Sequence, residues 1–162
     1  MRKLTALTLA AVLLAGCHSH SRPTTASSPA RLPAGSTTGG ADARAAVLGF
    51  LNAAKNQDLQ ALSGYWGTAE GAARTNGVIP RDEMERRELI MLCYLDHQSH
   101  TILTDAPGTA GERVLVAELR NGALTRSAKF NAVRASDGRW YVKTFDMEAL
   151  QDLCKDKSRP SP

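Results

Sequence analysis

Apolar residues recur at helical spacing in the first third of the segment that follows residue 41. This spacing predicts an amphipathic helix over 42–56, with Asp42 as its N-cap. The apolar positions i, i+3, i+4 and i+7 of this helix are Val47, Phe50, Leu51 and Ala54. A second, shorter helix is predicted over 59–65, and a connection rich in Gly, Ala and Asn follows over 67–77.

A third helix is predicted from Pro80 to the residue before Asp96. Acidic residues in its first turns complement the helix dipole. Its second half, Leu89 to Leu95, is apolar on every side, a pattern typical of a buried helix. We therefore expect this half of the helix to lie entirely in the core.

Alternating apolar and polar residues replace the helical spacing after residue 100. They predict an antiparallel set of strands and a final helical turn containing Leu150 and Leu153. The predicted strands are 101–104, 113–120, 123–134 and 139–145, with turns at Pro107-Gly108, Asn121-Gly122 and Asp137-Gly138. The order of elements predicts an α+β fold, with three N-terminal helices packed on a curved antiparallel sheet.

One charged residue interrupts an apolar row in the longest predicted strand. Arg126 lies between Leu124 and Ala128 on the face that should point inward. A buried guanidinium needs a partner, which could be a ligand anion, a carboxylate of the same chain, or water at the strand edge. Aromatic residues that could line a pocket beside Arg126, or simply fill the core, are Tyr65, Trp66 and Trp140.

The N-terminus has the layout of an export signal. Two basic residues, Arg2 and Lys3, precede an apolar run from Leu4 to Leu14, which is too short to span a bilayer. Small residues then lead to a cysteine, in the run Leu14-Ala15-Gly16-Cys17. This run resembles the lipobox of a bacterial lipoprotein, in which the cysteine is acylated and becomes the first mature residue. The alternatives are cleavage without lipid attachment, or a buried helix with a core cysteine.

The composition divides the chain into four parts. We expect a signal peptide at 1–16, an acylated cysteine and disordered tether at 17–40, one domain at 41–154 and a disordered tail at 155–162. The net charge of +4 suggests a basic protein, but the predicted domain holds 13 basic and 15 acidic residues. This balance argues against a nucleic-acid partner. The strands over 113–145 are basic, which indicates either a solvated face or a surface for an anionic ligand.

The other two cysteines form an even pair. In an oxidising compartment, Cys93 and Cys154 are expected to join the third helix to the C-terminal segment by a disulfide. Two separate buried thiols are the alternative.

The order of elements resembles the nuclear-transport-factor-2-like superfamily of cone-shaped α+β domains. The segment that carries this resemblance begins at Phe50 and ends at Leu62, with the pattern Ala…Asp…Leu at its centre. The resemblance implies a pocket between sheet and helices, which in enzymatic members holds an Asp or a His–Asp pair. No motif places such residues on this chain, so we predict no catalytic residues, no metal site and no cofactor.

A cluster of ionisable residues near the end of the third helix contains side-chain types that can support acid–base or zinc chemistry. Its members are Asp96, His97, His100 and Asp105. Because they lie at a helix end and a turn, we expect them to face water.

These observations predict a lipid-anchored protein of the cell envelope that is not an enzyme. It would bind a small ligand or an envelope partner through the cone pocket or the sheet face. The alternatives are an isomerase- or dehydratase-like enzyme and a structural or dimeric scaffold. Acyl chains would be the membrane contact, and His18 in place of an Asp after the cysteine favours the outer membrane, facing the periplasm, in a Gram-negative cell.

Acylation of Cys17 is directly testable. Each buried methylene contributes about 0.8 kcal/mol and stable anchoring takes two chains, so an acylated chain should remain in the membrane fraction. We expect palmitate labelling of the wild-type protein, its loss in Cys17→Ser, and accumulation of the precursor with globomycin. Labelling that persists in Cys17→Ser would contradict the prediction.

Overall fold

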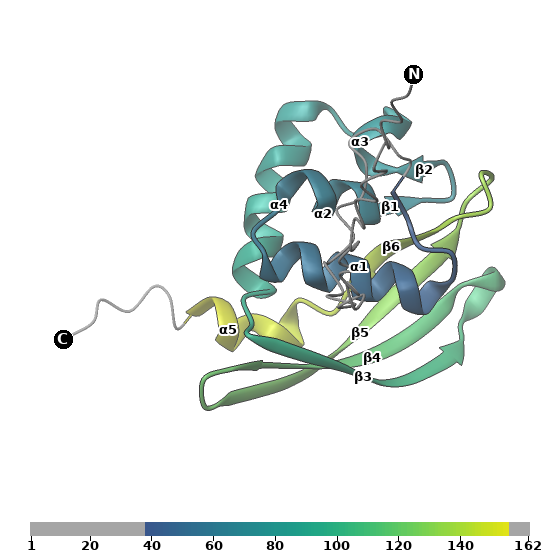
Figure 1. Ribbon diagram of the computed structural model, residues 1–162. Helices are drawn as coiled ribbons and strands as arrows, with labels where there is room; N and C mark the ends of the chain where they lie inside the picture. The colour runs from purple at the N-terminus through teal and green to yellow at the C-terminus, as the bar shows by residue number, and fades with distance from the viewer. Residues whose placement is uncertain (1–37, 156–162) are drawn as a thin grey trace, which may run out of the picture. The chain divides into compact units, whose positions relative to one another are not determined.

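The computed structural model describes residues 38–155, which form an α+β fold as the sequence predicts (Figure 1). N-terminal helices pack on a four-stranded antiparallel sheet, and a short helix follows the last strand. The predictions for the signal peptide, for Cys17, for the tether up to residue 37 and for the tail from residue 156 lie outside the described residues. Residues 38–40, assigned to the tether from sequence, are held by the domain: Gly40 bridges Trp140.

The first two helices begin and end where the apolar pattern predicts. Helix α1 spans Ala43–Lys55, and the Asp42 carboxylate accepts a hydrogen bond from the Ala45 amide at 2.7 Å. Helix α2 spans Leu59–Tyr65 and is capped in the same way by Asp58. Short polar side chains at the N-cap satisfy amide groups that the first turn leaves unbonded, which is why both helices begin at an aspartate.

Helix α4, Arg81–Tyr94, is buried along one face only. The prediction that its second half is wholly buried is wrong, since Leu89 is 59% exposed and Ile90 is 52% exposed. The helix packs beside α2 and the C-terminal helix, so its far side faces outward (Figure 1). The residues that face inward share helical spacing and are Met84, Glu88, Met91, Leu92 and Leu95.

The connection between α2 and α4 contains short elements that the sequence analysis did not predict. Strands β1 (Gly67–Thr68) and β2 (Gly71–Ala72) form a small antiparallel hairpin. Helix α3 (Ala73–Asn76) follows, ending at Gly77 with a φ of +68°. Elements of two to four residues are too short to show a hydrophobic period, so composition alone suggested a loop.

The main sheet has the order β3-β4-β5-β6, and all its neighbours are antiparallel. Its strands are β3 (Ser99–Pro107), β4 (Arg113–Asn121), β5 (Leu124–Arg134) and β6 (Trp140–Phe145). Strand β3 is longer than predicted and includes Pro107, which an edge strand tolerates because its outer amides need no partner. The turn between β4 and β5 consists of Gly122 and Ala123, one residue later than predicted.

The space between α1 and the sheet is filled by side chains. Three aromatic rings meet there: Phe50 of α1 lies 6.5 Å from Phe130 of β5 and 5.9 Å from Phe145 of β6, measured between ring centroids. Phe50 and Phe130 are fully buried, together with Leu115 and Leu119 of β4. The layer between α1 and the sheet is thus part of the hydrophobic core in this domain.

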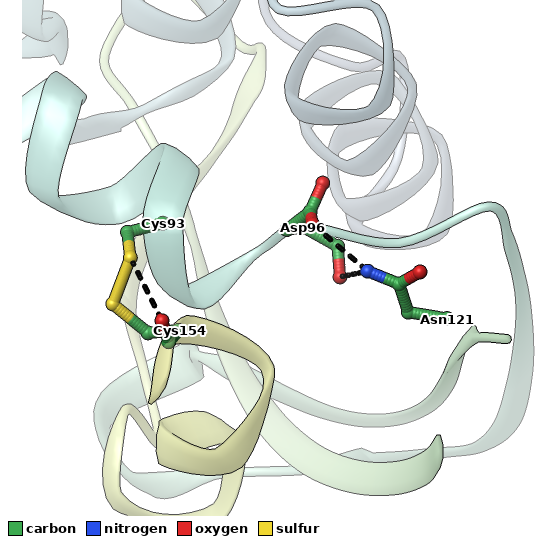
Figure 2. Close-up of a disulfide and its surroundings, with 4 residues drawn as sticks. All are labelled: Cys93, Asp96, Asn121 and Cys154. Atoms are coloured by element: carbon green, nitrogen blue, oxygen red, sulfur yellow. Dashed lines mark hydrogen bonds between the residues drawn. A yellow bond between two sulfur atoms is a disulfide. The ribbon is translucent and has the colours of Figure 1, made fainter. Parts of the chain in front are cut away.

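A disulfide joins α4 to α5 (Gln151–Lys155), the helix at the end of the described chain. Cys93 and Cys154 are bonded, with their Cα atoms 4.8 Å apart (Figure 2). The predicted pairing is therefore confirmed. Such a bond is typical of proteins outside the cytoplasm. Among the helices of residues 38–155, none is both long and apolar enough to cross a bilayer.

Loss of this disulfide should lower the free energy of unfolding. The bond closes a segment with a sequence separation of 61 residues, which corresponds to about 4 kcal/mol in the chain-entropy model. We expect the Cys93→Ser, Cys154→Ser double variant to lose about 2–4 kcal/mol in urea unfolding. The wild type measured in reductant is the control and should unfold like the double variant. Equal midpoints for the double variant and the wild type would contradict the prediction.

Candidate functional site

Arg126, the charged residue predicted on the inner face of β5, is paired within the chain. Its Nε and Nη2 atoms donate to Oδ2 of Asp152 in α5, at 3.1 and 2.6 Å. This is the second of the three partners considered from sequence, a carboxylate of the same chain. The guanidinium lowers the pKa of the Asp152 carboxyl. Arg126 thus helps hold α5 against the end of the sheet.

The three aromatic residues proposed from sequence as pocket-lining do not converge on Arg126. Tyr65, Trp66 and Trp140 are partly buried and pack against the main core. Trp66 also lines a shallow apolar groove of about 400 Å³ between α4 and β6. The other residues of this groove are Arg87, Ile90, Met91, Lys143, Thr144, Phe145 and Met147.

The ionisable cluster after α4 separates into different contacts. His97 is buried, and its Nδ1 donates to the carbonyl oxygen of Leu95 at 2.6 Å, while its Nε2 lies 2.8 Å from Nδ1 of His100. Asp96 accepts a hydrogen bond from Asn121 (Figure 2), and Asp105 pairs with an arginine of β4. The expectation that all four residues face water is wrong for His97, because the chain turns inward after α4. Among residues 38–155, no three metal-ligating side chains are grouped.

A second cleft, with a volume of about 610 Å³, lies between α2, α3 and α4. We call it the Glu88 cleft, after the carboxyl group that it contains. Its apolar lining residues are Leu59, Ala73, Ile79, Met84 and Leu89. Its polar and charged lining residues are Gln60, Ser63, Arg74, Thr75, Arg81, Glu85 and Glu88. Clefts of this size and mixed lining are typical of small-molecule sites.

Glu88 is the unusual member of this lining. Its side chain belongs to the inward row of α4, and the residue is only 2% exposed. Its Oε1 atom is buried and makes no hydrogen bond with any described residue. Thr38 Oγ1 is the one other such side-chain atom in residues 38–155, and it does not line the cleft. A buried oxygen without a partner costs about 1–3 kcal/mol, so its position needs an explanation.

Burial determines the protonation of Glu88. Desolvation raises the pKa of the carboxyl, the Ser63 hydroxyl opposes the rise, and the charge of Glu85 adds to it. The Ser63 hydroxyl has one proton, and Oγ donates it to the carbonyl oxygen of Leu59 at 2.9 Å. Burial is therefore the dominant cause, and it holds the pKa of this carboxyl above its usual value.

Two arginines lie at the rim of the Glu88 cleft with different partners. Arg81 is paired with Glu85 of the next helical turn at 3.0 Å. Arg74 of α3 donates from Nη1 to the carbonyl oxygen of Gln60 at 3.2 Å, and no ion pair joins it to a carboxylate of the described residues. The cleft thus combines an apolar body, one buried acid group and one guanidinium whose charge is not balanced by an ion pair.

Sequence analysis missed this cleft because a Glu within Glu85-Arg86-Arg87-Glu88 looks like part of a solvated helix surface. One signal could have found it: Glu88 lies four residues after Met84 and three before Met91, so it shares their helical face. The lining residues include no His, Cys or Lys among the described side chains. The arrangement offers hydrogen-bonding and charged groups of both signs beside an apolar surface.

The His97–His100 pair should make stability depend on pH. Burial, the neighbouring His97 and Lys55 lower the pKa of His100 to about 4, and burial also lowers the pKa of His97. Between pH 6.5 and pH 4, an unfolded histidine takes up a proton while the two rings stay neutral in the folded state. The unfolded chain therefore binds more protons in this range, so the free energy of unfolding should decrease as the pH is lowered from 6.5 to 4.

We expect the free energy of unfolding to be about 1–2 kcal/mol lower at pH 5 than at pH 7.5, after discounting for the partial exposure of His100. Urea unfolding at both values measures it. His100→Gln removes one titrating ring and should flatten this dependence. A slope that His100→Gln leaves unchanged would assign the effect to other groups.

Comparison with known proteins adds no assignment to this geometry. No protein-family model matches the chain, and no curated protein or solved structure is significantly similar to it.

Proposed function

We propose that this chain is a lipid-anchored protein of the bacterial cell envelope whose α+β domain binds a small ligand in the Glu88 cleft. The lipobox-like run ending in Cys17 supports the anchor, and the Cys93–Cys154 disulfide agrees with a location outside the cytoplasm. His18 after the cysteine supports the outer membrane, facing the periplasm, in a Gram-negative cell.

The observation that carries the ligand-binding proposal is the unpartnered Oε1 of Glu88 in a cleft of about 610 Å³. A leucine at this position would extend the apolar row of Met84, Met91 and Leu92 without this cost. Buried polar groups that lower stability and make no stabilising contact in the fold are characteristic of binding and active sites. The proposed ligand satisfies Oε1 and replaces the hydration that burial removes.

The family resemblance supports the fold of this proposal but shifts its site. In the nuclear-transport-factor-2-like superfamily the pocket lies between sheet and helices, and here Phe50, Phe130 and Phe145 occupy that space. The proposed site instead lies between the helices α2, α3 and α4.

An enzymatic role is the second candidate, and Glu88 also favours it. Burial raises the pKa of the Glu88 carboxyl, and a raised carboxyl pKa is a common property of general acids in enzymes. We place binding first because the other carboxylate of the lining, Glu85, is held in an ion pair with Arg81. Native mass spectrometry of the protein solubilised from membranes distinguishes a binding protein from a structural scaffold. A binding protein retains an unchanged compound, whereas a scaffold appears as a dimer without one.

Substitution of Glu88 tests the proposal. Glu88→Leu should raise the free energy of unfolding by about 1–2 kcal/mol, because it replaces an unsatisfied buried acid with an apolar group of similar size. The same variant should lose any ligand retained by the wild type. Because the pKa of Glu88 is raised in the folded state, the wild type loses stability as the pH rises and this group must ionise in the interior. The stability gained by Glu88→Leu should therefore be larger at pH 8 than at pH 4.5.

Glu83→Leu is the matched control on the same helix, since Glu83 does not line the Glu88 cleft. It should change stability by less than about 0.5 kcal/mol. A Glu88→Leu protein that is less stable than the wild type would show that Glu88 has a structural role and would overturn the proposal.

A further inference from the structure

We infer that the ligand of the Glu88 cleft is a small organic anion, with its negative group on Arg74 and a hydroxyl or amide donor on Glu88. This inference deepens the proposed function and rests on it. It follows from three features of the lining, which lie at the rim, on the floor and along the walls.

The rim favours an anion. Arg81 is neutralised by Glu85, whereas Arg74 makes one hydrogen bond to the Gln60 carbonyl oxygen and belongs to no ion pair among the described residues. A guanidinium has five N–H donors in a planar fork, so the single bond from Nη1 leaves most of them for a carboxylate or phosphate oxygen. Arg74 is exposed, which places its charge where an anionic group remains partly hydrated.

The floor requires a donor. Oε1 of Glu88 can accept a hydrogen bond, and none of the described residues supplies one. A second anionic group on the ligand is disfavoured there, because a charge buried beside the Glu88 carboxyl would have no cation as its partner among the lining residues other than the two arginines at the rim. A neutral hydroxyl or amide N–H fits this position without bringing charge into it.

The walls fit an apolar body between the two polar ends. Leu59 of α2, Ala73 of α3 and Met84 of α4 all line the cleft. Ile79, in the connection from α3 to α4, completes this apolar part. N-acylated amino acids and hydroxy acids combine these three groups: an anion, an apolar body and a neutral donor.

Three matched probes test the inference by ligand-observed NMR with the full-length, lipidated protein in detergent. They are N-acetylleucine, an anion; N-acetylleucine amide, its neutral equivalent; and leucinamide, a cation. We expect the anion to bind about tenfold more tightly than the neutral amide, the gain of one charge-assisted contact, and the cation to bind least. Arg74→Gln should abolish this preference, and Glu88→Leu should weaken the anion and the neutral amide alike. Arg44→Gln, on the exposed side of α1, is the matched control and should change nothing.

Two results overturn the inference. If the neutral amide binds as tightly as the anion, or if Arg74→Gln leaves the anion's affinity unchanged, the ligand is not an anion held by Arg74. The proposed function survives either result when Glu88→Leu still weakens the neutral amide. If no probe binds, the ligand class is wrong, and a compound retained in native mass spectrometry then decides the proposed function separately.

Discussion

The packing of α1 across the sheet is the contact on which the rest of this domain depends. Val47, Phe50 and Leu51 are fully buried against strands that contribute Leu115, Leu119 and Phe130. Because these side chains fill the layer between helix and sheet, that layer has no room for a ligand. The other helices then form a second layer, in which α4 packs against α2 and α5 (Figure 1). A cleft can form in this layer without disturbing the core.

Glu88 is where this arrangement departs from simple burial of apolar groups. Every other member of the inward row of α4 is apolar, and the acid among them has one oxygen without a partner. Local choices in a stable fold normally agree with the global structure, and exceptions concentrate where a site is needed. The pair of His97 and His100 is a different kind of exception, since both ring nitrogens of the buried His97 have partners within the domain.

The elements with a clear period were predictable from sequence, and the ones without it were not. Helix α1 shows a full apolar stripe with an aspartate cap, and strands β4 and β5 alternate around a glycine turn. Helix α4 was misjudged because a run that is apolar on all sides does not reveal which side is covered. Leu89 and Ile90 are exposed only because of where α4 packs, and this is a property of the tertiary structure.

The candidate site was harder to predict from sequence than the fold, because which side of a helix is covered depends on the tertiary structure. Arg126 stood out because a charge broke an apolar row, and it proved to be paired with Asp152. Glu88 also breaks an apolar row, but neighbouring arginines and glutamates hide it within a stretch that looks solvated. The wall residues of the cleft come from three elements, one of which, α3, is too short for any sequence period to indicate.

The contacts at the start of the described chain have a mechanical consequence. Arg139 donates to the carbonyl oxygens of Thr38 and Gly39 at 2.7 and 2.5 Å, and the Gly39 amide donates to Gly64 at the end of α2. A force on the chain that enters the domain is therefore shared between α1, which follows directly, and the neighbouring β6 and α2. Since α2 also lines the Glu88 cleft, the entering chain and the cleft are connected through one helix.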